Sequence, residues 1–142
     1  MKIRLLSVGR DKEATAELAA DYAGRLARVA SFELLELKAS DRAREGEALL
    51  AKARGELWAL DQTGTELTSE ELARRIGKLR DASAALTLVI GGDEGLSDEV
   101  RSKARFTWSL SRLTLPHRLA RVVVLEQLYR AFEILRGGPY HK

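Results

Sequence analysis

The sequence contains no cysteine and only two histidines among its 142 residues. The absence of cysteine excludes a disulfide scaffold, a thiolate nucleophile and any zinc or iron–sulfur site built on thiolates. Two histidines are too few for a metal site built from imidazoles, so we expect no metal. No apolar run is longer than a strand, which predicts no membrane span. The first ten residues lack the apolar core of a secretory signal, so we expect a cytoplasmic location.

The chain has the composition of an ordinary folded domain, with 45% hydrophobic and 32% charged residues. Its length predicts a single domain over residues 1–142. The net charge of +3 is unevenly distributed, because residues 97–142 hold 9 basic and 4 acidic side chains. We expect any polyanion to meet this C-terminal third first, although charge alone favours the alternative of an uneven, solvated surface.

Short apolar segments alternate with segments of helical spacing along the whole chain. Strands are predicted at residues 2–8, 32–37, 56–60, 86–90 and 105–110. Helices are predicted at residues 12–28, 42–54, 69–79 with Ser69 as cap, 98 onward with Ser97 as cap, and 117–135. This alternation indicates an α/β fold with a mostly parallel sheet flanked by helices.

A glycine-rich turn, Ile90-Gly91-Gly92-Asp93-Glu94-Gly95, follows the most apolar predicted strand. In open parallel sheets ligands bind at the carboxyl ends of strands, and glycines there let a backbone approach a ligand or adopt positive φ. The spacing fits neither the dinucleotide fingerprint nor a P-loop, and the two acidic residues would repel phosphate. The turn therefore suits an adenosine-type or cationic ligand, or it is a tight strand-to-helix connection.

The segment from Leu110 to His117 is unusually apolar for a loop. Backbone amides under leucine side chains need hydrogen-bond partners, which a bound ligand or neighbouring chain would supply. The helix that follows carries two adjacent apolar stripes, so it needs two burial partners. We expect one of these partners to be a second copy of the chain, with a central helix of a monomer core as the alternative.

Two polar features lie at the C-terminal end of the chain. Glu126 and Arg130 are spaced for an ion pair along the long helix, and Arg130 could instead contact an RNA phosphate or a base. The tail Tyr140-His141-Lys142 combines a stacking ring, a group that titrates near neutrality and a cation. Those groups suit an extruded base and its phosphates, although termini commonly fray.

Three segments together resemble the ribosomal RNA large-subunit methyltransferase H family of the SPOUT superfamily: IGGDEG, WSLSRLTLPH and RVVVLEQLYRAFEILRGGPYHK. The resemblance covers the whole chain, from KIRLLSVGR to the final lysine, and is most specific in the C-terminal block. It implies a SPOUT-type fold with a C-terminal trefoil knot and a homodimer. It also implies an S-adenosyl-L-methionine-dependent enzyme that methylates N3 of a pseudouridine in a stem-loop of large-subunit (23S) rRNA.

The resemblance also assigns roles to particular residues. The cofactor pocket is expected to contain Leu60, Gly91, Gly92, Leu110, Ser111, Arg112, Leu113, Thr114 and Leu115. The substrate side maps to Arg130 and Lys142, and His141, Tyr140 and Arg130 are the candidate catalytic residues. His141 is the candidate base, because its pKa range suits removal of the imide proton.

The chain has no separate RNA-binding segment, so we expect the substrate to be the rRNA in the assembled ribosome. If the tail reaches a second subunit, the active site is composite. Two other functions remain open from the residues alone. One is a non-catalytic RNA-binding factor, and the other is an α/β enzyme that uses a different adenosine ligand. Cofactor binding distinguishes them, because an RNA-binding module needs neither the glycine turn nor the apolar loop.

Overall fold

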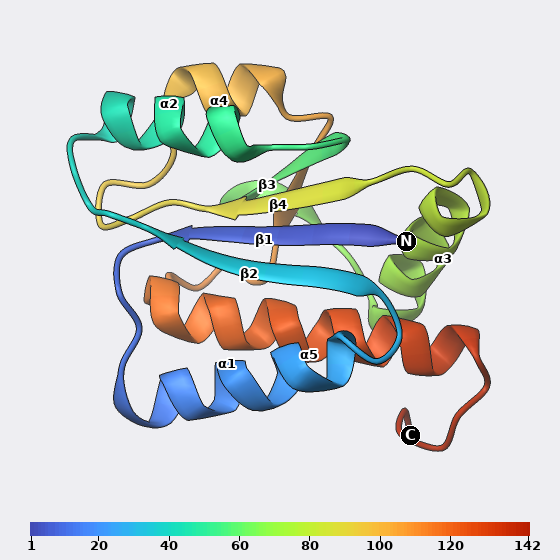
Figure 1. Ribbon diagram of the computed structural model, residues 1–142. Coiled ribbons are helices and arrows are strands. Elements are labelled where there is room, and N and C mark those ends of the chain that lie inside the picture. The colour runs from blue at the N-terminus through green and yellow to red at the C-terminus, as the bar shows by residue number, and fades with distance from the viewer.

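The computed structural model describes residues 1–142, in which five strands form one parallel sheet (Figure 1). The strands are β1 (Lys2–Val8), β2 (Ser31–Leu37), β3 (Glu56–Glu66), β4 (Leu86–Ile90) and β5 (Phe106–Ser109). Their order in the sheet is β2-β1-β4-β3-β5, and every neighbouring pair is parallel. The predicted α/β class with a parallel sheet is therefore confirmed.

Five helices cover the two faces of this sheet. They are α1 (Glu13–Leu26), α2 (Arg42–Lys52), α3 (Ser69–Asp81), α4 (Asp98–Lys103) and α5 (His117–Leu135). Helices α2 and α4 lie on one face, while α1 and α5 lie on the other with α3 against α5 (Figure 1). None of these helices is both long and apolar enough to cross a membrane.

The core consists of apolar side chains on both faces of the sheet. All five residues of β4 are buried, as expected for a parallel strand that is covered on both sides. The larger apolar cluster lies between the sheet and α1, α3 and α5, and includes Trp58, Leu125 and Leu128. A smaller cluster beneath α2 and α4 includes Leu49 and Val100.

Most predicted element boundaries agree with the structure to within one or two residues. The Ser97 hydroxyl accepts a hydrogen bond from the Val100 amide, as expected of the cap of α4. The cap of α3 is Thr68 rather than Ser69, since the Thr68 hydroxyl accepts from the Glu71 amide at 3.1 Å. Leu18, predicted on the apolar stripe of α1, has 48% of its surface exposed.

The third strand is longer than the sequence predicts. Asp61–Gly64 was expected to end it as a turn, but β3 continues to Glu66. The strand keeps its pairing with β5 across this segment through a register shift between Leu60 and Thr65. A side chain at Gly64 would place its Cβ 2.4 Å from the Thr107 carbonyl oxygen, so glycine there allows the strands to approach. Pairing with β5 outweighs the local turn preference.

Candidate functional site

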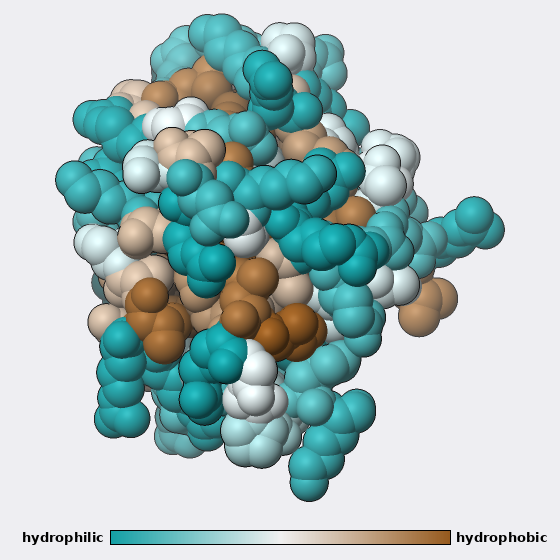
Figure 2. All heavy atoms as spheres, turned by 90° about the vertical axis from the view of Figure 1, so that its right-hand side faces the viewer, coloured by the Kyte–Doolittle hydropathy of each residue, from teal (hydrophilic) through white to brown (hydrophobic).

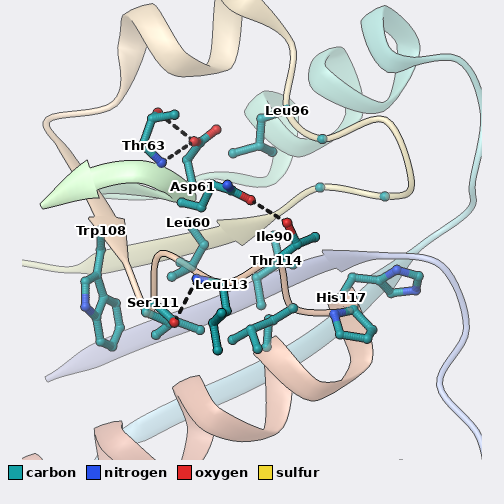
Figure 3. A pocket seen from close by; sticks show the side chains of 18 of the residues that line it. Leu60, Asp61, Thr63, Ile90, Leu96, Trp108, Ser111, Leu113, Thr114 and His117 are labelled. Atoms are coloured by element: carbon teal, nitrogen blue, oxygen red, sulfur yellow. Dashed lines mark hydrogen bonds between the residues drawn. The ribbon is translucent and has the colours of Figure 1, made fainter. Parts of the chain in front are cut away.

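A cavity of about 570 Å³ opens at the carboxyl ends of β4 and β5, beside the middle of β3 (Figure 3). That volume is typical of small-molecule sites. Of the nine residues predicted to bind a cofactor, eight line the cavity: Leu60, Gly91, Gly92, Leu110, Ser111, Leu113, Thr114 and Leu115. Segments that are 50 residues apart in the sequence therefore meet at one site, as the parallel topology requires.

The ninth predicted residue, Arg112, does not line the cavity. Its side chain is 93% exposed and pairs with Glu66 at 3.4 Å, on the outside of the loop. Its guanidinium therefore makes no contact in the cavity, and its backbone is the only part of Arg112 that belongs to the cavity loop.

The glycine turn after β4 needs its glycines mainly for its own packing. A Cβ on Gly91 would lie 2.5 Å from the carbonyl carbon of Gly95, and the Gly95 amide donates to the Gly92 carbonyl at 3.0 Å. The positive φ of 76° is at Gly95 and not at the two glycines that follow the strand. Gly91 and Gly92 therefore shape a compact wall of the cavity, against which the chain folds back.

The loop from Ser111 to Leu115 leaves its backbone available to a ligand. It takes no part in the backbone-to-backbone hydrogen bonds outside the regular elements. Side chains engage two of its backbone groups: the Leu113 amide donates to the Ser111 hydroxyl at 3.0 Å, and the Ser111 carbonyl accepts from the Ser109 hydroxyl at 3.0 Å. Leu113 is 73% exposed, an unusual position for a leucine beside a cavity. The helix that follows has Pro116 at its N-cap position and no side-chain cap. Free amides and an exposed leucine are what a flat aromatic ligand with polar edges requires.

Sequence reasoning missed three polar residues of β3 that line the cavity: Asp61, Gln62 and Thr63. Asp61 accepts from the amide and the hydroxyl of Thr63 (Figure 3). It also pairs with Arg101 at 2.7 Å. Partial burial opposes ionisation of Asp61, but these hydrogen bonds and the Arg101 charge hold its pKa below the ordinary value. Asp61 is therefore ionised, and its charge is balanced by Arg101, which also lines the cavity.

Gln62 and His117 complete the polar lining. The Gln62 carboxamide oxygen accepts from the Thr114 hydroxyl at 3.1 Å, which joins β3 to the apolar loop. His117 begins α5 and lies 3.6 Å from the Asp93 carboxylate. The signal that could have identified Asp61 and Gln62 was their position immediately after a predicted strand, at the same sheet edge as the glycine turn.

The C-terminal tail folds back onto its own protomer instead of fraying. The Tyr140 hydroxyl donates to Glu126 at 2.7 Å and lies 3.2 Å from the Tyr22 hydroxyl. Its ring packs edge-on against Tyr129, with the Arg130 guanidinium over it at 4.8 Å. Burial, together with the hydrogen bonds to Tyr22 and Glu126, raises the pKa of the Tyr140 phenol. Tyr140 therefore stays protonated.

Glu126, Arg130 and His141 form a connected polar network beside that tyrosine. The Glu126 carboxylate accepts two hydrogen bonds from the Arg130 guanidinium, from Nη2 at 2.6 Å and from Nε at 3.3 Å. Burial opposes ionisation of Glu126, but hydrogen bonds from Arg130 and Tyr140 lower its pKa. The His141 ring lies 3.0 Å from Arg130 and 2.8 Å from Glu70, while Lys142 is exposed. The structure thus brings together the predicted catalytic residues His141, Tyr140 and Arg130.

These catalytic candidates and the cavity lie at different ends of α5 (Figure 1). His117 lines the cavity, and Arg130 follows it by thirteen residues, which is roughly 20 Å along a helix axis. One protomer in this conformation therefore keeps the tail network away from its own cavity.

The cavity fits an adenosine-type ligand and shows nothing that would hold a metal. No group of three or more histidine, aspartate or glutamate side chains in the chain could bind an ion. The amides of the Ser111–Leu115 loop and the exposed Leu113 match the polar edge and the apolar ring of an adenosine-type ligand.

Comparisons with known proteins give a consistent picture. A family model described as "Predicted SPOUT methyltransferase" matches residues 1–141. Two curated relatives carry the name Ribosomal RNA large subunit methyltransferase H. The chain is 46% identical to the one from Anaeromyxobacter sp. (strain Fw109-5), with all of both chains covered. It is 39% identical to the one from Psychrobacter sp. (strain PRwf-1), with 100% of this chain and 99% of the relative covered.

The fold also resembles that of a solved structure, the SpoU methyltransferase AviRb from Streptomyces viridochromogenes in complex with the cofactor AdoMet. The TM-score is 0.52 at 15% identity, and the match covers 96% of this chain and 59% of that one.

Proposed function

This chain belongs to the SPOUT methyltransferase family, and from that membership we propose that it methylates RNA of the large ribosomal subunit. Its cofactor is S-adenosyl-L-methionine. Curated relatives that match over the full length of both chains carry the name of this activity. The structural observation that carries the proposal is the cavity, because it unites the glycine turn and the leucine-lined loop that the resemblance assigns to the cofactor. We further propose that residues 1–142 form one such domain and that the predicted knot encloses this site.

In the cavity, the backbone of Ser111–Leu115 would hold the cofactor, Leu60 and Leu113 would exclude water from its ring, and Asp61 with Arg101 would form the polar wall beside it. When bound, the cofactor supplies a methyl carbon on a positively charged sulfur, which leaves as a neutral thioether when a nucleophile attacks. No metal is required for that chemistry. What the chain must provide is alignment of the acceptor, which can contribute about 7–11 kcal/mol, and removal of its proton.

We propose N3 of a pseudouridine as the acceptor and the tail network as the catalytic group. His141 takes the imide proton, and general-base catalysis of this kind typically raises the rate by about 10²–10⁴-fold. Tyr140 is kept protonated by burial and its hydrogen bonds, so it acts as a hydrogen-bond donor and not as the base. Arg130 faces the developing negative charge, and the exposed Lys142 binds a phosphate.

The tail network and the cavity must meet for the reaction, and they can do so if the enzyme acts as a homodimer. In a two-fold dimer with antiparallel α5 helices, the tail of one protomer approaches the cavity of its partner. Exposed apolar side chains on α1 and α5 support such an interface: Leu18, Leu119 and Val123 are 48%, 48% and 38% exposed. The composite site also explains why residues with a catalytic role lie at a chain terminus.

We propose that the substrate is the rRNA within the assembled ribosome, which places the enzyme in the cytoplasm. The net charge of the chain is only +3, so few phosphate contacts are expected with a bare stem-loop. The test is mass spectrometry of rRNA nucleosides after incubation of ribosomes, the protein and an isotopically labelled methyl donor. We expect label on a pseudouridine of the large subunit, whereas an unlabelled rRNA would refute the proposed activity.

Calorimetry separates this proposal from the two other functions. We expect S-adenosyl-L-methionine to bind and ATP and NAD to show no binding under the same conditions. Tighter binding of ATP or NAD would indicate a different adenosine-using enzyme, and no binding of any of the three would indicate an RNA-binding factor.

A further inference from the structure

The two nitrogens of the His141 ring face partners of opposite character. Nδ1 lies 3.0 Å from Nη1 of Arg130, and Nε2 lies 2.8 Å from Oε1 of Glu70. A guanidinium has no acceptor atom, so Nδ1 must carry a lone pair and accept from Arg130. Nε2 must then carry the ring hydrogen and donate it to the Glu70 carboxylate. The surroundings therefore select one neutral tautomer of His141.

Glu70 is well placed to hold that hydrogen bond. It lies in the first turn of α3, where a negative charge is favoured by the helix dipole. The hydrogen bond from His141 also lowers the pKa of Glu70 below its ordinary value, so the carboxylate is ionised at neutral pH. Its side chain is 54% exposed, so it has no part in the core.

The remaining groups around the ring keep Arg130 in place. Glu126 from α5 holds the guanidinium, and Tyr140 from the tail lies beneath it. Tyr22 from α1 hydrogen-bonds to this network through the Tyr140 hydroxyl and packs against Tyr129. This network lies on the side of the molecule formed by α3 and the C-terminus, where hydrophilic side chains cover most of the surface (Figure 2).

We propose that Glu70 is a positioning residue of the methyl transfer, because it fixes His141 as the Nε2–H tautomer and leaves Nδ1 as the basic nitrogen. This inference rests on the proposed function. In the free protein Arg130 occupies Nδ1, and the substrate must displace that contact. The imide proton then moves to Nδ1, and the electron pair of the broken N–H bond stays on the imide nitrogen, where it attacks the methyl carbon. The imidazolium that forms keeps its Nε2–H on Glu70.

The tautomer can be measured without substrate or cofactor. Long-range proton–nitrogen NMR distinguishes a protonated from an unprotonated ring nitrogen, and the chain has only His117 and His141 to assign. We expect His141 of the wild-type protein to show a protonated Nε2 and an unprotonated Nδ1. The Glu70→Ala variant should show a mixture of both tautomers, and the matched variant Glu71→Ala, in the same helical turn, should retain the wild-type spectrum.

Kinetics then connect the tautomer to the reaction. For Glu70→Ala we expect kcat on ribosomes to fall by about tenfold or more, with KM changed by less than about twofold. Glu70→Gln retains a carbonyl oxygen that accepts from Nε2, so it should keep the tautomer and a kcat within about threefold of wild type. Because Glu70 is exposed, these variants should fold, and circular dichroism checks this.

Specific results would overturn the inference. They are an Nδ1–H tautomer in the wild-type protein, an unchanged kcat in Glu70→Ala, or a Glu70→Gln variant as slow as Glu70→Ala. A wild-type protein with the expected tautomer but no methyl transfer to rRNA would instead refute the proposed function.

Discussion

At the scale of single residues, the least ordinary group is a buried arginine at the start of α5. Arg121 lies 3.2 Å from Asp11 and 2.9 Å from Glu36, and its side chain is 7% exposed. Its Nε atom and Asp11 Oδ2 have no hydrogen-bond partner within the chain. The cluster ties α5 to the ends of β1 and β2, next to the wall of the cavity.

Removal of this arginine should leave two carboxylates without their counter-charge. We expect Arg121→Ala to lower the free energy of unfolding by about 3–5 kcal/mol, measured by urea denaturation at fixed protein concentration. The control is Arg112→Ala, whose ion pair with Glu66 is on the surface and should be worth less than about 1 kcal/mol. If both variants lost the same free energy of unfolding, the buried cluster would stabilise the fold no more than a surface ion pair does.

Docking of the tail should depend on pH through Glu126. Its pKa in the folded protein lies below the ordinary value of 4.5, because hydrogen bonds from Arg130 and Tyr140 outweigh the effect of burial. A lowered pKa means that the stabilisation is fully present above pH 4.5 and is lost as the pH falls through the lower value. We expect NMR signals of Tyr140 to report release of the tail under acid conditions. In Glu126→Gln that pH dependence should weaken, and the part that remains is expected from Glu70, whose pKa is also lowered and which holds His141. A pH dependence unchanged in Glu126→Gln would contradict the assignment to Glu126.

At the scale of elements, the glycine turn offers the sharpest prediction. Because a Cβ on Gly91 would meet the Gly95 backbone at 2.5 Å, Gly91→Ala must open the turn. We expect the affinity for S-adenosyl-L-methionine, measured by calorimetry, to fall by about tenfold, which is 1.4 kcal/mol. Gly24→Ala in α1 is the control, since nothing lies within 4 Å of that position. It should leave affinity unchanged and stabilise the helix by about 0.5–1 kcal/mol.

The elements also show how far the sequence alone can predict the molecule. Leu86–Ile90 and His117–Leu135 were predicted to the residue, because a short β-branched run and a helix bounded by Pro116 and Gly137 are strong local signals. The turn-forming residues Asp61–Gly64 misled the prediction of β3, whose course depends on pairing with β5. Propensity describes a residue's own backbone preference, and that pairing involves residues more than 40 positions away.

The candidate site could be predicted only in part, because some of its contacts join residues that are far apart in the chain. The carboxyl ends of parallel strands meet at one edge, so the glycine turn and the leucine loop could be placed together from the sequence. The tail was not predictable from local pattern, since its position depends on Tyr22 and Glu70, far away in the chain. Arg130 was expected either in an ion pair or at the substrate, and in the free protein it makes the ion pair with Glu126.

At the scale of the whole molecule, the proposed dimer can be tested by complementation. At a cofactor concentration well below the Kd of Gly91→Ala, the cavity variant Gly91→Ala and the tail variant His141→Ala should each have low activity alone. If the tail acts on the partner's cavity, an equal mixture that exchanges subunits should recover about a quarter of the wild-type rate, because half of the dimers then hold one intact site. A mixture no faster than its components would show that cavity and tail act within one protomer.

The length of helix α5 sets the distance between the cavity at its start and the tail network near its end. Each residue added to or removed from it would shift everything beyond by 1.5 Å and rotate it by 100°. A single-residue insertion between His117 and Glu126 would therefore swing the tail network off its contacts with α1 and α3, even though no side chain had changed. Among related chains, insertions and deletions should therefore fall in the connections between elements, and the number of residues in α5 should stay constant.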